Sequence, residues 1–179
     1  MTLDELFLAA SVSPWQDMNA HVNTLREFAS KCDVVTEFGV RGGVSTAALL
    51  AGRPKMLISY DIAPFAEAAE YIAAAEAESI KFIFKQQDDC KELILPTEFL
   101  LIDTEHNYQQ LEKELRMHAH LVSRWIAMHD THMELYPPAH PQTSYEMWKA
   151  INDLIDGGEW MMVIDNMYCS GLTVLERAK

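Results

Sequence analysis

The feature that most limits how this chain can fold is a regular alternation of short apolar runs with longer stretches of helical character. Apolar runs of strand length lie at 34–38, 56–61, 80–84, 99–103 and 125–129. Helical stretches separate them, including an alanine-rich segment at 65–77 and an amphipathic segment at 107–121. This alternation predicts an α/β fold whose parallel strands are joined by right-handed crossovers.

The two ends of the chain depart from the alternation. Two further apolar runs, 160–164 and 172–175, are separated only by a turn-like segment, so they predict an antiparallel hairpin added to the parallel sheet. Residues 1–32 predict a short helix and then an amphipathic helix capped by Ser13, with Pro14 and Trp15 near its start. We expect one domain, 1–179, with N-terminal helices (1–32), an α/β core (33–179), seven strands and helices on both faces.

Composition narrows the class of partner. The 179 residues carry a formal net charge of -13 and have a pI near 4.8, so no basic surface is available for nucleic acid or anionic membranes. Cys32, Cys90 and Cys169 form no CxxC pair, which is typical of reduced thiols. There is no basic signal peptide and no run of eighteen apolar residues. We expect a cytoplasmic protein that acts on a small molecule; whether it forms a homodimer is left open.

A glycine-rich turn joins the first predicted strand to the next helix, with the sequence EFGVRGGVS at 37–45. Glycines allow a sharp turn and close approach of a ligand, and the helix start offers unpaired amides to an anionic group. The second predicted strand ends at Asp61, where an open parallel sheet places an acid that can accept hydrogen bonds from ribose hydroxyls. A purely structural turn is the alternative, but Asp61 favours a nucleoside ligand.

The order of the glycines separates two kinds of nucleoside ligand. A dinucleotide-binding turn reads G-x-G-x-x-G, and its second glycine leaves room for a pyrophosphate. Arg41 occupies that position, and Glu37 precedes the turn. A bulky residue and an acid argue against a pyrophosphate and favour a ligand with a cationic end, whose amino group Glu37 would bind directly or through water.

The chain resembles the class I S-adenosylmethionine-dependent methyltransferases, and within them the small cephalosporin-hydroxylase-like group. The resemblance covers most of the chain from Asp33 onward and rests on VTEFGVRGGVSTAALL at 35–50, YDI at 60–62, LLIDTEHNYQQLEKEL at 100–115, MHDTH at 128–132 and GLTVLER at 171–177. It implies a Rossmann-like methyltransferase fold with a mostly parallel seven-stranded sheet that ends in an antiparallel hairpin.

The resemblance also implies a binding site for S-adenosylmethionine. Glu37, Gly39 and Gly43 would line its methionine part, Asp61 would hold the ribose, and Asp88 or Asp89 would lie near the adenine. The full set of candidate cofactor-binding residues is Glu37, Gly39, Val40, Arg41, Gly43, Ser45, Asp61, Ile62, Asp88 and Asp89.

Polar side chains also follow the fourth and fifth predicted strands. Asp103 ends the fourth, and His129 with Asp130 ends the fifth, so all three should converge beside the glycine turn. Two acids and an imidazole are a suitable ligand set for Mg²⁺, Mn²⁺ or Zn²⁺. A helix-capping role for Asp103 and a polar loop at 129–132 are the structural alternatives.

The resemblance supports a metal and adds a base. Metal-dependent O-methyltransferases place one acid after the fourth strand and two ligands after the fifth, and they often keep a lysine three residues beyond the first acid. His106 occupies that position, and a histidine can accept a proton near neutral pH. We therefore expect Asp103 and His106 to be catalytic, although cephalosporin-hydroxylase-like members also have histidine here and their chemistry varies.

The remaining candidates are interpreted as structural. His118 and His120 point to different faces of a helix, and Cys90 has no basic neighbour that would activate a thiol. A proline-containing loop at 134–143, flanked by His132 and His140, is expected to cover the acceptor pocket or to be a surface excursion.

The sequence thus predicts an S-adenosylmethionine-dependent methyltransferase for a small molecule, acting on oxygen with help from a divalent metal. Two other functions are left open. One is an NAD-dependent oxidoreductase, which Arg41 and the closing hairpin disfavour. The other is a non-catalytic module of the same fold that binds a nucleoside ligand, because a fold does not by itself establish a function.

Overall fold

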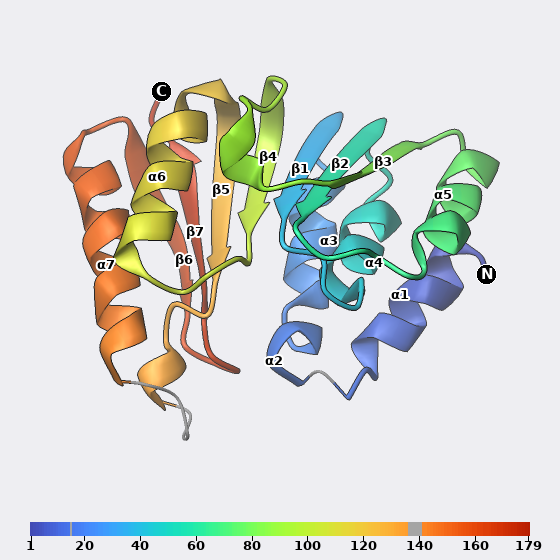
Figure 1. Ribbon diagram of the computed structural model, residues 1–179, viewed down its shortest axis with the longest axis horizontal. Helices are drawn as coiled ribbons and strands as arrows, with labels where there is room; N and C mark the ends of the chain where they lie inside the picture. The colour runs from blue at the N-terminus through green and yellow to red at the C-terminus, as the bar shows by residue number, and fades with distance from the viewer. Residues whose placement is uncertain (15, 136–140) are drawn as a thin grey trace.

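The computed structural model describes residues 1–14, 16–135 and 141–179 of the chain (Figure 1). Its seven strands match the predicted apolar runs to within a few residues. They are β1 (Val34–Phe38), β2 (Met56–Asp61), β3 (Lys81–Gln86), β4 (Thr97–Ile102), β5 (Val122–His129), β6 (Trp160–Asn166) and β7 (Leu172–Arg177).

The strands form one mixed sheet in the order β3-β2-β1-β4-β5-β7-β6. Strands β3, β2, β1, β4 and β5 pair in parallel, and β7 lies antiparallel between β5 and β6. The predicted terminal hairpin is confirmed, with β7 rather than β6 beside the parallel part. Because β1 and β4 are central neighbours that run the same way, their carboxyl ends, with those of β2, β3 and β5, lie at one edge of the sheet.

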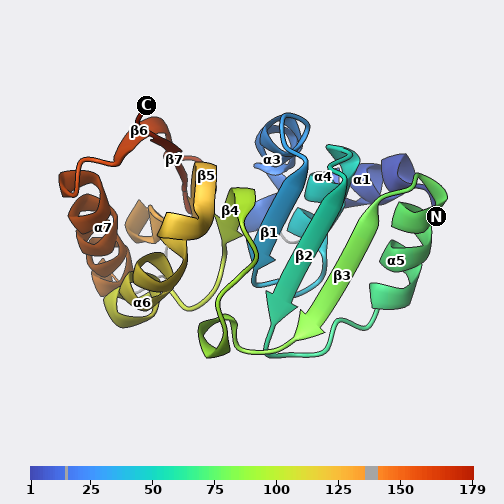
Figure 2. The same ribbon diagram turned by 90° about the horizontal axis from the view of Figure 1, so that it is seen from above.

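Helices cover both faces of the sheet (Figure 2). Those on one face pack around α4, and α6 and α7 pack together on the other. Asn107 caps α6 by accepting a hydrogen bond from the Gln110 amide at 2.9 Å. The helices are α1 (Leu3–Ser11), α2 (Gln16–Asn19), α3 (Val22–Ala29), α4 (Val44–Ala51), α5 (Ala68–Ala77), α6 (Tyr108–His118) and α7 (Pro141–Asp156).

The prediction of one continuous helix from Ser13 to Phe28 is wrong. The structure divides this segment into α2 and α3, and residue 15 lies outside the described residues. The break falls at His21, which is fully buried and whose Nε2 lies 3.2 Å from the Cys169 carbonyl oxygen. The break therefore coincides with a buried polar contact to a residue that is distant in the sequence.

Two crossover segments also differ from the prediction. Between β3 and β4 the described chain forms only a short 3-10 turn, η1 (Asp89–Lys91), where a helix was expected. After β5 the predicted loop is replaced at its ends by η3 (Met133–Leu135) and by α7, while residues 136–140, including His140, lie outside the described residues. No helix in the described part of the chain is both long and apolar enough to cross a bilayer.

Candidate functional site

A cavity of about 340 Å³ opens at the carboxyl ends of β1 to β4. This is the edge at which an open parallel sheet binds ligands. Each of these strands or its following loop contributes to the wall, and α6 closes one side. The lining residues are Gly39, Tyr60, Asp61, Ile62, Asp88, Asp89, Asp103, Thr104, Glu105 and Gln110.

The glycine turn is shaped by contacts within the protein. Gly39 has φ +83°, and a Cβ there would lie 2.0 Å from the Asp103 carbonyl oxygen. Gly43 has φ +76°, and a Cβ there would lie 2.7 Å from the Phe65 ring. Gly39 lets the end of β1 pass close against the backbone that follows β4, so the turn and Asp103 meet beside the cavity, while Gly43 leaves room for the Phe65 ring.

Asp61 holds the glycine turn in place from the end of β2. Its Oδ2 accepts hydrogen bonds from the backbone amides of Val40 at 2.7 Å and Arg41 at 3.0 Å. Its Oδ1 accepts one from the amide of Ala63 at 2.8 Å. A carboxylate has about four acceptor positions, so Asp61 retains capacity for a ligand hydroxyl on the side that lines the cavity.

Glu37 lies beneath the turn and not on the cavity wall. Its side chain is completely buried, and its Oε2 accepts hydrogen bonds from the hydroxyls of Thr46 at 2.8 Å and Ser59 at 2.5 Å. Burial raises the pKa of Glu37 to about 7 against the opposing effect of nearby hydroxyls. Its Oε1 has no hydrogen-bond partner among the described residues. Glu37 is thus a buried acid close to its ionisation point at neutral pH.

The far side of the turn is closed by α2. Met18, which is 2% exposed, shares a hollow of only about 10 Å³ with Val40, Arg41, Ser45 and neighbouring residues, room for about one water. The Arg41 guanidinium donates to both carboxylate oxygens of Asp17 on α2, at 3.1 Å and 2.9 Å. No sequence pattern indicated this ion pair, which holds α2 against the glycine turn.

Asp103, His106, His129 and Asp130 form a compact group, the Asp/His cluster, at the ends of β4 and β5. His129 Nδ1 lies 3.2 Å from Asp103 Oδ1 and 3.3 Å from Asp130 Oδ2. His106 Nε2 lies 2.8 Å from Asp130 Oδ2. One ligand atom each from Asp103, His129 and Asp130 lies within 4.8 Å of the others, so these three residues are close enough to share one ion.

Electrostatics in the Asp/His cluster favour charged groups. Burial disfavours the charged form of each residue, but the two carboxyls raise the pKa of His106 to about 9 and that of His129 to about 10. Burial likewise opposes ionisation of Asp103 and Asp130, yet the two imidazoles lower the pKa of both carboxyls. The cluster therefore holds two carboxylates and two imidazolium ions at neutral pH.

His21 is a buried neighbour of this cluster that sequence reasoning missed. Its ring packs edge-to-face on His129, with 5.2 Å between centroids. Burial and the charge of His129 lower its pKa, so His21 is the neutral imidazole of the group. The only sequence signal was a polar residue interrupting an amphipathic helix.

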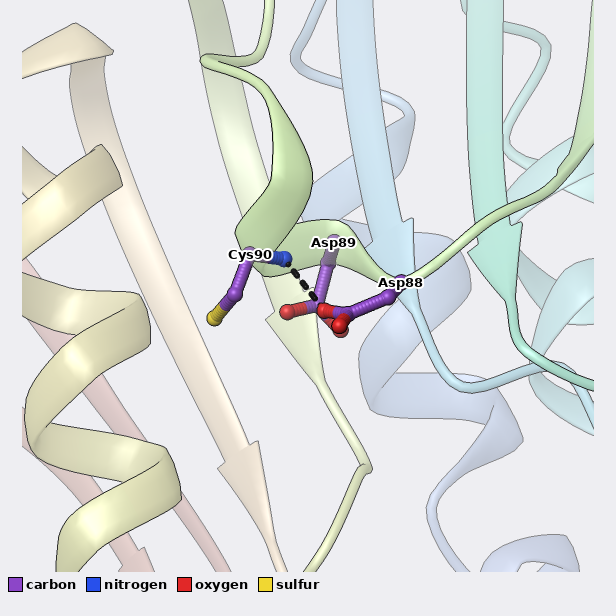
Figure 3. Close-up of side chains that lie close together, drawn as sticks. All are labelled: Asp88, Asp89 and Cys90. Atoms are coloured by element: carbon purple, nitrogen blue, oxygen red, sulfur yellow. Dashed lines mark hydrogen bonds between the residues drawn. The ribbon is translucent and has the colours of Figure 1, made fainter.

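Asp88, Asp89 and Cys90 also lie together, after β3 (Figure 3). Asp88 accepts a hydrogen bond from the Cys90 amide at 2.8 Å, while the Cys90 thiol lies 3.8 Å from the Gln110 amide nitrogen. Burial, and then Asp89, raises the pKa of the thiol to about 12. A protonated thiol is a poor metal ligand, so this group is better described as an acidic wall of the cavity.

The structure brings together only part of the predicted cofactor set. Gly39, Asp61, Ile62, Asp88 and Asp89 line the cavity, whereas Val40, Arg41 and Ser45 surround the small hollow beside α2. Thr104, Glu105 and Gln110 were missed, although they follow Asp103 in the same quoted segment. His118 is buried and His120 is exposed, so the two point in different directions, as expected.

No protein-family model and no curated protein sequence matches the chain. Solved structures do match it along most of its length. The O-methyltransferase TomG from Streptomyces achromogenes, in complex with SAM, is 16% identical with a TM-score of 0.68, and the match covers 99% of this chain and 89% of the TomG chain. An O-methyltransferase from Bacillus cereus, in complex with SAH, is 14% identical with a TM-score of 0.66, and the match covers 98% of this chain and 90% of that protein.

The N-methyltransferase NodS from Bradyrhizobium japonicum is similar as well, with 11% identity, a TM-score of 0.62 and coverage of 94% and 99%. These likenesses show that the chain has the class I methyltransferase fold. They include proteins that methylate different atoms, so the fold does not identify the acceptor.

Proposed function

We propose that the protein is an S-adenosylmethionine-dependent methyltransferase that acts on an oxygen atom of a small molecule. The observation that carries this proposal is the placement of the cavity, which joins the glycine turn, Asp61 and Asp89 at one end and reaches Asp103 of the Asp/His cluster at the other. A cofactor bound along it would bring its reactive end toward that cluster. Methyl transfer is an in-line displacement, for which orientation can supply about 7 to 11 kcal/mol of barrier reduction.

In this proposal each end of the cofactor meets a suitable group. Asp61 accepts hydrogen bonds from the ribose hydroxyls, and Asp89 faces the adenine. The amino group and sulfonium give the other end positive charge, and the Asp103 carboxylate and the buried Glu37 lie on that side. Met18 and the Asp17–Arg41 ion pair stand where the methionine chain would run, so binding requires α2 to shift.

The Asp/His cluster fits a divalent cation by the chemistry of its ligands. Asp103, Asp130 and His129 would hold the ion, and its chemistry would be to lower the pKa of a coordinated acceptor hydroxyl, as such ions lower that of water from about 15.7 to about 7. An imidazole binds a metal only when neutral. Because His129 is protonated at neutral pH, we expect metal affinity to increase as the pH rises.

His106 is the proposed base for the acceptor hydroxyl. Its Nε2 lies 2.8 Å from Asp130, so the ring is held at the edge of the cluster. Without a cation its pKa of about 9 keeps it protonated, and it can then donate a hydrogen bond but cannot remove a proton. Turnover that depends on this base should therefore rise with pH toward about 9.

The test is transfer of a labelled methyl group from S-adenosylmethionine to a panel of hydroxylated small molecules, with and without a chelator. We expect a labelled product, reduced by the chelator and in Asp130→Ala and His106→Ala, but not in His120→Ala, which alters an exposed histidine. Full turnover with chelator would reject the metal, and full turnover in His106→Ala would reject the base. Binding of the cofactor without any product would favour the non-catalytic alternative.

A further inference from the structure

The loop after β5 carries Asp130 in a strained backbone conformation. Asp130 has φ +58°, in the left-handed region that residues other than glycine seldom adopt. Its carboxylate joins the two imidazoles of the Asp/His cluster, because Oδ2 lies 2.8 Å from His106 Nε2 and 3.3 Å from His129 Nδ1. A strained conformation persists only where the surrounding structure holds it, so the neighbours of Asp130 in the fold must supply the restraint.

The next two residues, Thr131 and His132, are buried and fixed by hydrogen bonds. The Thr131 carbonyl accepts a hydrogen bond from Trp148 Nε1 on α7 at 2.8 Å, and its hydroxyl accepts one from Thr173 on β7 at 2.9 Å. The His132 amide donates to the Ser170 carbonyl at 2.6 Å. The segment that follows Asp130 is therefore attached to α7, to β7 and to the turn between β6 and β7.

The ring of His132 is held by Asp165 near the end of β6. His132 Nε2 lies 2.6 Å from Asp165 Oδ1, and because a carboxylate only accepts hydrogen bonds, Nε2 is the donor. Strand β7 pairs with β5 on one side and with β6 on the other, so the ends of β5 and β6 lie at the same end of the sheet (Figure 1). The contact thus links the loop after β5 to the outermost strand.

The turn between β6 and β7 is itself strained where it meets this loop. Cys169, Ser170 and Gly171 have φ +47°, +66° and +96°, three left-handed residues in succession. The Ser170 carbonyl accepts the His132 amide, and the Cys169 carbonyl oxygen lies 3.2 Å from Nε2 of His21, which packs against the Asp/His cluster. Strained residues gather at functional sites, so the conformation of this turn indicates a role in the neighbouring cluster.

Gly171 is the point at which the turn comes closest to the loop after β5. A Cβ at Gly171 would lie 2.7 Å from the His132 amide nitrogen and 2.8 Å from the His132 Cβ. A larger residue would therefore displace His132, and with it the backbone of Asp130 two residues earlier. Gly158, in the turn before β6, has a similar φ of +80°, but a Cβ there would meet nothing within 4 Å. Comparing the two glycines separates backbone strain from displacement of His132.

We propose that His132 and Gly171 are positioning residues that hold the Asp130 carboxylate in place for a divalent cation bound by the Asp/His cluster. Asp165 takes part by holding the His132 ring. The inference rests on the metal role in the proposed function and extends that site from its ligands to the hairpin of β6 and β7. The described lining of the cavity includes none of these three residues, so binding of the cofactor should not depend on them.

The experiment titrates the purified protein with Mn²⁺ by calorimetry at pH 8, in wild type, Gly171→Ala and Gly158→Ala. Gly171→Ala should bind Mn²⁺ at least about tenfold more weakly than wild type, because residues that orient a metal ligand typically change metal affinity by that much. Gly158→Ala is the matched control and should bind Mn²⁺ as wild type does, because its Cβ has open space. Titration with S-adenosylhomocysteine should give the same affinity in all three proteins.

The contrast between the two ligands distinguishes positioning from a general structural role, because general destabilisation would weaken both. Equal Mn²⁺ affinity in wild type and Gly171→Ala, or an equal loss in Gly171→Ala and Gly158→Ala, would overturn the inference and leave the proposed function intact. Absence of Mn²⁺ binding by wild type would overturn the metal role and this inference together, whereas binding of S-adenosylhomocysteine would still support the cofactor site.

Variants of His132 keep the inference testable if Gly171→Ala does not fold, which circular dichroism would show. The glutamine amide in His132→Gln can still donate to Asp165, whereas the alanine in His132→Ala cannot. Mn²⁺ affinity should fall at least about tenfold in His132→Ala and be largely restored in His132→Gln. An equal loss in both variants, or no loss in either, would overturn the proposal.

Discussion

Replacing Glu37 by glutamine should shift the difference in stability between variant and wild type in favour of the variant as the pH becomes alkaline. Glu37 is completely buried under the glycine turn, and in the described part of the chain it forms no ion pair with a lysine or arginine. Its hydrogen-bond donors are the hydroxyls of Thr46 and Ser59. These neutral groups stabilise a carboxylate less than a cation would, so ionisation of Glu37 is disfavoured in the folded state.

The magnitude follows from the two pKa values. Burial raises the pKa of Glu37 from an ordinary value of 4.5 to about 7 in the folded protein. Between these values the native state binds more protons than the unfolded state, so its stability falls as the pH rises. At about 1.36 kcal/mol per pH unit, the full loss is about 3 kcal/mol, of which about 2 kcal/mol falls between pH 5.5 and pH 8.5.

The assay is urea unfolding followed by circular dichroism at pH 5.5 and pH 8.5. The difference in unfolding free energy between Glu37→Gln and wild type should move by about 2 kcal/mol in favour of the variant at the higher pH. A constant cost of burying the amide does not affect this change. Glu27→Gln, which alters an exposed glutamate paired with Lys31, is the control and should show no such trend. A pH-independent difference for Glu37→Gln would refute the reasoning.

Two further variants test the geometry of the turn. Asp61→Ala should weaken binding of S-adenosylhomocysteine at least tenfold by calorimetry, because hydrogen bonds to a charged group contribute about 1.5 to 3 kcal/mol each. Asp61→Asn keeps one acceptor oxygen and should lose less affinity. Equal affinity in wild type and both variants would exclude the ribose role. Gly39→Ala should lose about 3 kcal/mol or more of stability, or fail to fold, because its Cβ would meet the Asp103 carbonyl at 2.0 Å; normal thermal unfolding would contradict this geometry.

The sheet could be predicted from the sequence because its signal is local. Each strand is a short apolar run, and the short connection between β6 and β7 excludes a crossover helix. The break in the N-terminal helix was not predicted, and the residue at the break makes its contacts far away in the sequence: His21 meets Cys169 and His129. The segment between β3 and β4 has no helical pattern of apolar residues. A helix was expected there only because two parallel strands need a crossover connection.

The candidate site was predictable where it follows from topology. The order and direction of the parallel strands bring Asp61, Asp103, His129 and Asp130 to one edge of the sheet, independently of their side-chain conformations. Side-chain orientation was not predictable in the same way. Both faces of β1 are buried, so strand alternation did not tell that Glu37 would lie under the turn and not on the cavity wall. Glu114 lies three residues after Leu111 on the buried face of α6, at a position where an apolar residue would be expected.

The measurement that tests the central claim most directly is a parallel calorimetric titration of the purified protein with S-adenosylhomocysteine and with NADH. A mostly parallel sheet and a glycine turn are common to both ligand classes, but Arg41 occupies the position that a pyrophosphate needs. We predict one site per chain for S-adenosylhomocysteine, with a dissociation constant in the micromolar range or below, and no heat of binding for NADH. Binding of NADH alone, or of neither ligand, would contradict the account.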